Sequence, residues 1–237
     1  MWSSSEAFLR FVQSKPYELA VSERDARIIT ALPVVERVFR AGSVIVEEER
    51  ATRTHTFVAS GWAFSYLAMA NGHRVINDFL MRGDFEGAQQ TADGARRTIQ
   101  ARTDVTVFEI DARRAAECPI LAMFIFRLFA RNSCVAAERL ASISRRTPQQ
   151  RLVRLFLEIA HRHEQADLGS LARFEFPFTQ RDLGDALGLT AIHINRLLRL
   201  LRDQGSLRFQ HRTVELPSRP ALARATDFNP GYIHFPG

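Results

Sequence analysis

Hydrophobic and polar positions divide the chain into stretches of different periodicity. Residues 3–32 show two short helical patterns, and Ser22 followed by Asp25 marks the capped start of the second. From Val34 to Ile110, short β-rich segments alternate with turn signals. The segments are VVERVF, SVIVEE, HTFVAS, FSYLAM, RVINDFL, RTIQA and VTVFEI. Strands at this spacing predict a sandwich or a barrel-like roll.

The turn signals between these segments are rich in glycine. They lie at Ala41-Gly42, Ser60-Gly61, Asn71-Gly72 and Gly83-Asp84. Asn71-Gly72 between two β-rich runs predicts a type I′ hairpin turn.

After Asp111 the pattern becomes helical and carries two apolar stripes side by side. One stripe can cover the roll and leave the other for a second copy of the chain, which we favour; burial of both within one subunit is the alternative. The candidate dimer residues are Leu121, Ile125, Phe126, Phe129, Ser133, Ala136 and Leu140.

A capping box at Thr147-Pro148-Gln149-Gln150 predicts that a fresh helix begins there and runs through His163. We place the domain boundary at this point. The expected fold is α+β, with N-terminal helices and a β-roll over 1–117, a long helix over 118–146 and a third domain over 147–237.

The segment TQRDLGDALGLTAIHINRLLRLL, residues 179–201, predicts two capped helices joined by a short turn. Thr179 and Thr190 can cap the helices, Gly188 suits a left-handed turn, and Gly184 is small enough for a close crossing. Two helices arranged in this way form a helix-turn-helix. The segments SLRF and TVEL after it flank His211-Arg212 like a small hairpin, or wing.

The outward face of the second helix, residues 190–204, has the chemistry of a DNA reader. Arg196 lies at its centre and can offer a bidentate fork to guanine, His193 can bond a base or a phosphate, and Ile192 can contact a thymine methyl. The residues better suited to phosphates are Asn195, Arg199, Thr179, Gln180 and Arg181, together with the His211-Arg212 hairpin tip. The candidate DNA-binding residues are Thr179, Gln180, Arg181, Thr190, Ile192, His193, Asn195, Arg196, Arg199, His211 and Arg212. A solvated polar face on an ordinary helix pair is the alternative.

The distribution of charge agrees with a polyanionic partner for the C-terminal part. Residues 1–144 hold 18 basic and 17 acidic side chains, whereas residues 145–237 hold 14 and 9, so most of the net charge of +6 lies there.

The N-terminal sequence, the apolar runs and the cysteine content indicate the cellular compartment. We see no secretory signal at the N-terminus, and the apolar run Pro119–Phe126 is short for a membrane span. With only Cys118 and Cys134, we expect a cytoplasmic protein without disulfides or a membrane partner, and two buried, inert thiols; a redox switch is the alternative.

Together these segments resemble the Crp/Fnr superfamily of bacterial transcription regulators. The most specific part of the resemblance is FPFTQRDLGDALGLTAIHINRLLRLLRDQG, residues 176–205. The resemblance implies a cyclic-nucleotide-binding-like sensor roll, whose signal can modulate activity, and a long helix that forms a homodimer. It also implies binding to palindromic promoter DNA, with RNA polymerase as a further partner of an activator.

The chain departs from the family pattern at two places. Many members carry a glutamate in the recognition helix where this chain has Ile192. In the nucleotide pocket, Gly87 is followed by Ala88, which cannot bond a ribose hydroxyl. Only Glu86, Arg96 and Arg97 remain as effector candidates, so we do not expect cyclic nucleotide binding.

Other cofactors and an enzymatic role are not expected. Two cysteines are too few for an iron–sulfur cluster, and His55 and His73 lack partners at metal or haem spacing. A cupin-like β-roll enzyme would need clustered ligands that are missing here. The remaining alternative function is a sensor or adaptor dimer that acts through protein contacts without binding DNA.

Overall fold

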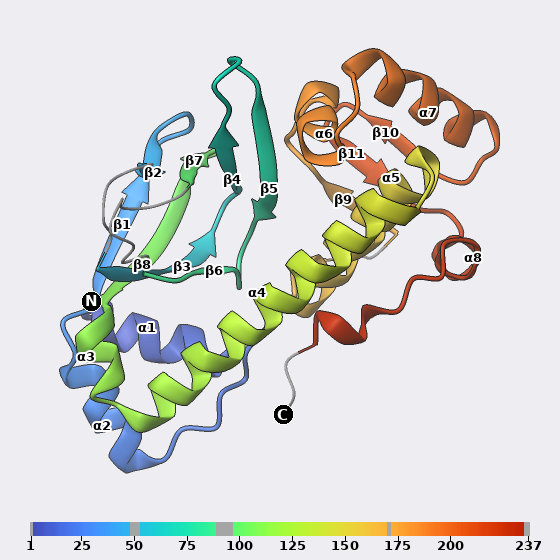
Figure 1. Cartoon of the computed structure of the whole chain (residues 1–237). Helices are drawn as coiled ribbons and strands as arrows, with labels where there is room; N and C mark the ends of the chain where they lie inside the picture. The colour runs from blue at the N-terminus through green and yellow to red at the C-terminus, as the bar shows by residue number, and fades with distance from the viewer. Residues whose placement is uncertain (1, 48–52, 89–96, 170–171, 235–237) are drawn as a thin grey trace. The chain divides into compact units, whose positions relative to one another are not determined.

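The computed structural model describes residues 2–47, 53–88, 97–169 and 172–234. The fold is α+β, as predicted (Figure 1). Contacts divide the chain into two compact units. The first comprises Met1–Ala68 and Asp78–Ala130, and the second comprises Met69–Asn77 and Arg131–Gly237.

Two short helices open the first unit, in agreement with the sequence. They are α1 (Ser4–Gln13) and α2 (Glu23–Ala31), and the Ser22 side chain accepts a hydrogen bond from the Asp25 backbone N–H at 3.2 Å. Phe8 of α1 packs edge-on against Phe57 and Phe108, with ring centroids 5.1 and 5.6 Å away. This contact fixes α1 on the strands that follow.

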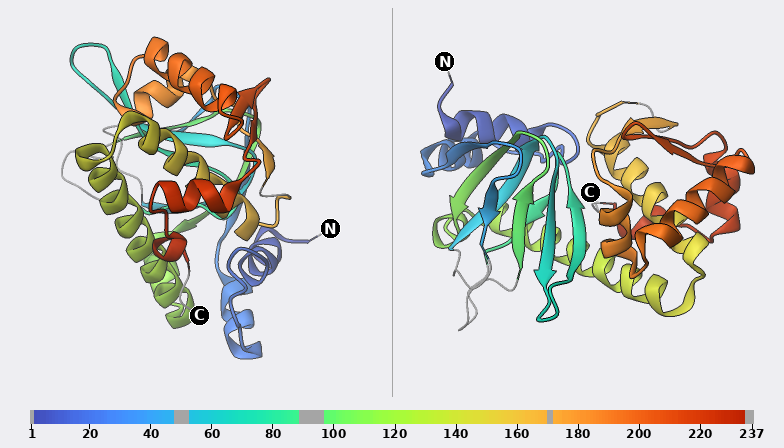
Figure 2. Two further views of the ribbon diagram at one scale, coloured as in Figure 1. Left: turned by 90° about the vertical axis from the view of Figure 1, so that its right-hand side faces the viewer. Right: turned by 90° about the horizontal axis from the view of Figure 1, so that it is seen from above.

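The predicted roll is formed by two four-stranded sheets (Figures 1 and 2). Their orders are β1-β8-β3-β6 and β2-β7-β4-β5. The strands are β1 (Val35–Phe39), β2 (Val44–Val46), β3 (Thr54–Ser60), β4 (Ala63–Ala68), β5 (Arg74–Leu80), β6 (Phe85–Glu86), β7 (Thr98–Ala101) and β8 (Val105–Asp111). Only β6, two residues long, was not predicted.

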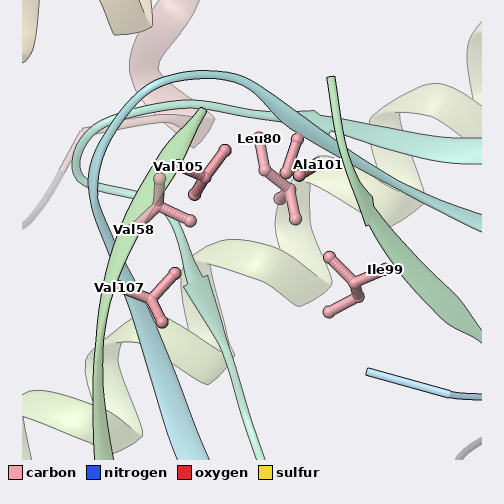
Figure 3. Close-up of a cluster of buried hydrophobic side chains, with 7 residues drawn as sticks. Val58, Leu80, Ile99, Ala101, Val105 and Val107 are labelled. Carbon is pink, nitrogen blue, oxygen red and sulfur yellow. The ribbon is translucent and has the colours of Figure 1, made fainter. Parts of the chain in front are cut away.

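Alternate residues of both sheets point inward and form one apolar core (Figure 3). One sheet contributes Val58, Val105 and Val107. The other contributes Ala63, Leu80, Ile99 and Ala101, so burial of these side chains holds the two sheets face to face.

Gly42, Gly61 and Gly83 have positive φ, as their turns require. The type I′ prediction at Asn71-Gly72 is wrong, because only Gly72 has positive φ there. The Met69 backbone N–H donates to the His73 carbonyl, which leaves a three-residue loop. A type I turn that ends in one left-handed residue explains this geometry.

The short helix α3 (Ala112–Ala116) leads to the long helix α4 (Pro119–Arg145). The predicted second stripe is buried, including Leu121 and Ile125 at 0% and 6% exposure. The prediction that Leu121 and Ile125 lie in the dimer interface is therefore wrong, because side chains packed inside their own chain are not available to a partner. Phe126, Phe129 and Leu140 are exposed as that set requires.

Two further observations concern expectations around α4. Cys118, just before the helix, is buried as predicted, but Cys134 on the helix is exposed, which differs from the expectation of two buried thiols. By length and composition alone α4 is also apolar enough to cross a membrane, although the apolar run Pro119–Phe126 is short.

The second unit contains helices around a small sheet. Its elements are α5 (Pro148–Gln165), β9 (Arg173–Glu175), α6 (Gln180–Leu187), α7 (Ala191–Asp203), β10 (Arg208–Gln210), β11 (Thr213–Glu215), α8 (Arg219–Ala225) and a 3₁₀ turn at Pro230–Tyr232. Thr147 and Gln150 form the predicted capping box. The sheet order β10-β11-β9 confirms the predicted hairpin and adds β9, which was not predicted.

Helix α5 is buried on all sides from Leu152 to His163, and the charged Arg154, Glu158 and Arg162 in this stretch form ion pairs. Glu158, 3% exposed, accepts from Arg139 of α4, from Arg162 at 3.3 Å and from the Tyr232 hydroxyl at 3.2 Å. Burial raises the pKa of the Tyr232 phenol, which keeps that hydroxyl a donor. One carboxylate thus joins α5 to α4 and to the C-terminal segment.

A second group of charges acts at the same junction. Glu138 of α4 pairs with Arg146 at 2.9 Å and with the buried Arg154 of α5. Arg154 also donates to the Thr226 carbonyl at 2.8 Å. Because breaking such buried pairs leaves an uncompensated charge, they hold α4, α5 and the C-terminal segment in one arrangement.

Gly184 allows α6 and α7 to cross closely, as predicted. A Cβ at this position would lie 2.5 Å from the Leu189 carbonyl oxygen and 3.6 Å from the Ala191 nitrogen. The obstacle is backbone, which cannot swing aside as a side chain can.

We predict that Glu158→Gln lowers the free energy of unfolding by at least about 3 kcal/mol, because the buried Arg162 and the half-buried Arg139 lose a buried carboxylate partner. Urea denaturation measures this change. Glu164→Gln on the same helix is the control, since Glu164 is half exposed and should cost under about 1 kcal/mol. Equal losses in the two variants would contradict the role given to Glu158.

We predict that Gly184→Ala destabilises the second unit by about 1–3 kcal/mol through overpacking. Helix propensity alone gives the opposite sign, because alanine favours a helix by about 1 kcal/mol over glycine. Thermal unfolding distinguishes the two. Gly188→Asn serves as control, because Gly188 has φ of +67° with open space around it and asparagine tolerates that conformation. A more stable Gly184→Ala variant would refute the close crossing.

Candidate nucleic-acid interface

The frame of the candidate interface is two capped helices joined by a three-residue turn. Thr179 and Asp182 form a capping box at the start of α6. Gly188 ends α6 in the left-handed conformation, and Thr190 caps α7 by accepting from the His193 backbone N–H at 3.2 Å. The predicted helix-turn-helix is therefore present, with each cap on its predicted residue.

Helix α7 buries one face and exposes the other. Ile194, Leu197, Leu198 and Leu201 are at most 7% exposed and pack into the unit. The outward side carries Ile192, Asn195, Arg196 and Arg199 exposed and His193 half-buried. This side combines two guanidinium groups, an imidazole, an amide and one alkyl side chain, which is the chemistry that reads base edges and phosphates.

The two helices are also joined by a polar contact at the same surface. The Asn195 side-chain nitrogen donates to the Gln180 Oε1 at 3.1 Å. Both residues were predicted phosphate contacts, and the hydrogen bond holds their side chains next to each other on α6 and α7. Arg181 beside them is exposed.

Thr179 has its predicted role as the cap of α6. Its hydroxyl and its backbone N–H both donate to the Asp182 Oδ2 at 2.7 Å. Both donors of Thr179 thus take part in the cap, and its predicted phosphate contact stays a prediction. Gln180 and Arg181 are the other phosphate candidates on α6.

The wing presents its two basic residues on strained backbone. His211 and Arg212 are exposed and have φ of 48° and 60°, so the β10–β11 turn is type I′ without a glycine. The left-handed conformation costs about 1–2 kcal/mol per residue with a Cβ. The Arg212 carbonyl accepts from the Phe176 backbone N–H at 2.7 Å, which holds this turn in place.

One charge arrangement in the wing was missed from the sequence. Glu215 on β11 lies between Arg208 of β10 and Arg173 of β9, at 3.9 and 3.7 Å. The pairing follows from strand register, which aligns Glu215 with both arginines. The pair with Arg173 could be predicted only if β9 were known.

The effector candidates lie in the first unit and are partly engaged with one another. Arg97 forms an ion pair with the buried Glu86, and Arg96 lies outside the described residues. Phe129 lies directly over Gly87, where a Cβ would meet its ring at 2.1 Å. The residues in this region thus bind each other, and the expectation that no cyclic nucleotide binds stays a prediction.

His55 lies beside these residues and is neutral near pH 7. Burial lowers the pKa of His55 to about 4. Its Nδ1 accepts from the Ala88 backbone N–H at 3.1 Å, so the ring has a structural role there. Within the described ranges no three His, Cys, Asp or Glu side chains gather in a way that could hold a metal ion.

Comparisons with known protein families match both parts of the chain. Residues 36–118 match the cyclic nucleotide-binding domain, and residues 150–225 match the Crp-like helix-turn-helix domain. Together the two matches cover most of the sequence.

Curated relatives are regulators of the same organisation. The nitrogen fixation regulation protein FixK of Azorhizobium caulinodans is 27% identical over 208 residues, which is 86% of this chain and 83% of that protein. The fumarate and nitrate reduction regulatory protein of Escherichia coli is 23% identical over 172 residues, 70% and 68% of the two chains.

Solved structures show the same fold. FixK2 from Bradyrhizobium japonicum superimposes with a TM-score of 0.72 at 25% identity, over 81% of this chain and 97% of that one. A CooA mutant from Carboxydothermus hydrogenoformans gives 0.66 at 18% identity, over 92% and 94%. With its β-roll, long helix and capped helix-turn-helix, this chain belongs to the Crp/Fnr superfamily and is a DNA-binding transcription regulator rather than an enzyme.

Proposed function

We propose that two copies of this chain associate through α4 and bind a two-fold symmetric promoter site. The support is the outward stripe of α4, which exposes large apolar side chains toward both ends of the helix. Their exposed fractions are Met123 56%, Phe126 66%, Phe129 44%, Leu140 68% and Ile143 42%. An apolar stripe of this length on one helix is typical of a protein–protein interface.

A dimer accounts for α4 better than a membrane does. The helix carries Arg127, Arg131, Glu138 and Arg139 within its length, and charges are costly in a bilayer. Its other face is buried within the chain. We therefore infer a cytoplasmic protein whose partners are promoter DNA, its own second copy and, when it activates, RNA polymerase.

The recognition step rests on the outward side of α7, which is the observation that carries this proposal. Arg196 would enter the major groove and bond the O6 and N7 atoms of guanine. His193, Asn195 and Arg199 would bond a base or phosphates around it, with Gln180 and Arg181 on α6. The wing residues His211 and Arg212 would bind the flanking backbone.

We predict that selection from random DNA with the full chain enriches a two-fold symmetric motif, and that Arg196→Ala enriches none. Loss of a bidentate guanine contact should cost about 1–3 kcal/mol per half-site. Arg199→Ala is the matched control on the same face. It should retain the motif and only reduce the salt dependence of binding, by a slope of about 0.9 for each lost phosphate contact.

Thermal unfolding and sedimentation of each variant show whether it remains folded and associated. Arg196→Ala that still selects the wild-type motif would contradict the role of α7. It would instead favour the adaptor dimer that acts without DNA.

We predict that the strained wing turn lowers the free energy of unfolding and that its basic side chains contribute to DNA binding. Arg212→Gly should raise the free energy of unfolding by about 1 kcal/mol, because glycine adopts φ of 60° without strain, and it should weaken DNA binding. His211→Asn is the comparison, since it relieves strain and keeps the arginine. Denaturant titration and affinity at two salt concentrations measure both effects. Unchanged DNA affinity in Arg212→Gly would remove the wing from the interface.

A further inference from the structure

Ile192 is the most exposed of the large hydrophobic side chains in the described part of the chain, at 83%. It lies in the first turn of α7, two residues after the cap Thr190. Its neighbour Ile194 is fully buried, so Ile192 has no part in the core of the unit. Single exposed apolar residues are common on protein surfaces. Ile192 differs because it lies on the side of α7 that is proposed to contact DNA.

Ile192 shares its helical face with Arg196. The two are four residues apart, which places them on one side of α7 and about 6 Å apart along its axis. Successive bases on one strand are about 3.4 Å apart. A helix that lies along a groove with Arg196 at one base would therefore bring Ile192 to a base about two steps away.

The chemistry available on this face selects among bases. Helix α7 contains no carboxylate before Asp203, at its far end. Cytosine offers an amino donor in the major groove and is read by an acceptor, whereas thymine offers a methyl group. An alkyl side chain at Ile192 thus complements thymine and offers nothing to cytosine.

We propose that Ile192 is a specificity-determining residue that packs on a thymine methyl, about two base steps from the guanine bound by Arg196. This inference rests on the proposed function, because it requires that α7 enters the major groove. It adds which base the half-site carries at a second position and which side chain chooses it.

The test removes the methyl group and the side chain separately. In the DNA site selected by the wild-type protein, each thymine of the half-site is replaced in turn by deoxyuridine, which lacks only the methyl. At one thymine the wild-type affinity should fall about fourfold per half-site, the value of one buried methyl-sized group. Ile192→Ala should bind the thymine and deoxyuridine sites equally at that position.

A gain-of-specificity variant provides the second arm. Selection with Ile192→Glu should replace the thymine at this position by cytosine, because the carboxylate accepts from its amino group. The guanine assigned to Arg196 should remain in the motif, which shows that the variant is folded and bound in the same register.

The outcomes separate this inference from the proposed function. If the wild-type protein selects no motif, the proposed function fails and this inference fails with it. If a motif depends on Arg196 but deoxyuridine affects wild type and Ile192→Ala alike at every thymine, only the role of Ile192 is overturned. The same holds if Ile192→Glu selects an unchanged half-site.

Discussion

The arrangement of the DNA-binding unit depends on two carboxylates, one buried and one half-buried, that must stay paired. Glu158 and Glu138 hold arginines from α4 and α5, and Glu158 also binds Tyr232 of the C-terminal segment. Removing one partner from such a pair costs far more than the pair itself contributes, so the charges specify one geometry rather than adding stability. The C-terminal half of α4 and all of α5 therefore behave as one body.

This body connects two surfaces that would otherwise be independent. The outward stripe of α4 is apolar and extends from Met123 to Ile143, and α6 with α7 follows α5 in the same unit. In the proposed dimer, the paired carboxylates and the close approach at Gly184 would fix the distance between the two α7 helices. The geometry of the dimer and the spacing of the two half-sites would then both follow from these contacts.

Local signals in the sequence predict much of this molecule. The caps Thr147, Thr179 and Thr190 and the left-handed Gly188 lie where the pattern places them, because capping chemistry acts over three or four residues. The outward face of α7 follows from helical periodicity in the same way, and so does the steric role of Gly184. The roles of its side chains toward DNA stay predictions.

Features that depend on distant parts of the chain could not be predicted in this way. Periodicity shows that α4 has two apolar stripes but not which one is covered, so Leu121 and Ile125 were assigned to the wrong face. The Thr179 cap was predicted, but the sequence does not show that its hydroxyl and its backbone N–H both donate to the same oxygen of Asp182. The Glu158 network joins residues up to 74 positions apart.

A dimer held together through α4 would set the separation of its two α7 helices, and the spacing of the two half-sites measures that separation. Two copies of the selected half-site are placed as an inverted repeat, and the spacer between them is varied one base pair at a time while affinity is measured. The account predicts one sharp optimum, with half-site centres about one helical turn, ~34 Å, apart, and a steep loss when half a turn is added. Affinity that does not depend on the spacer, or equals that of a single half-site, would contradict it.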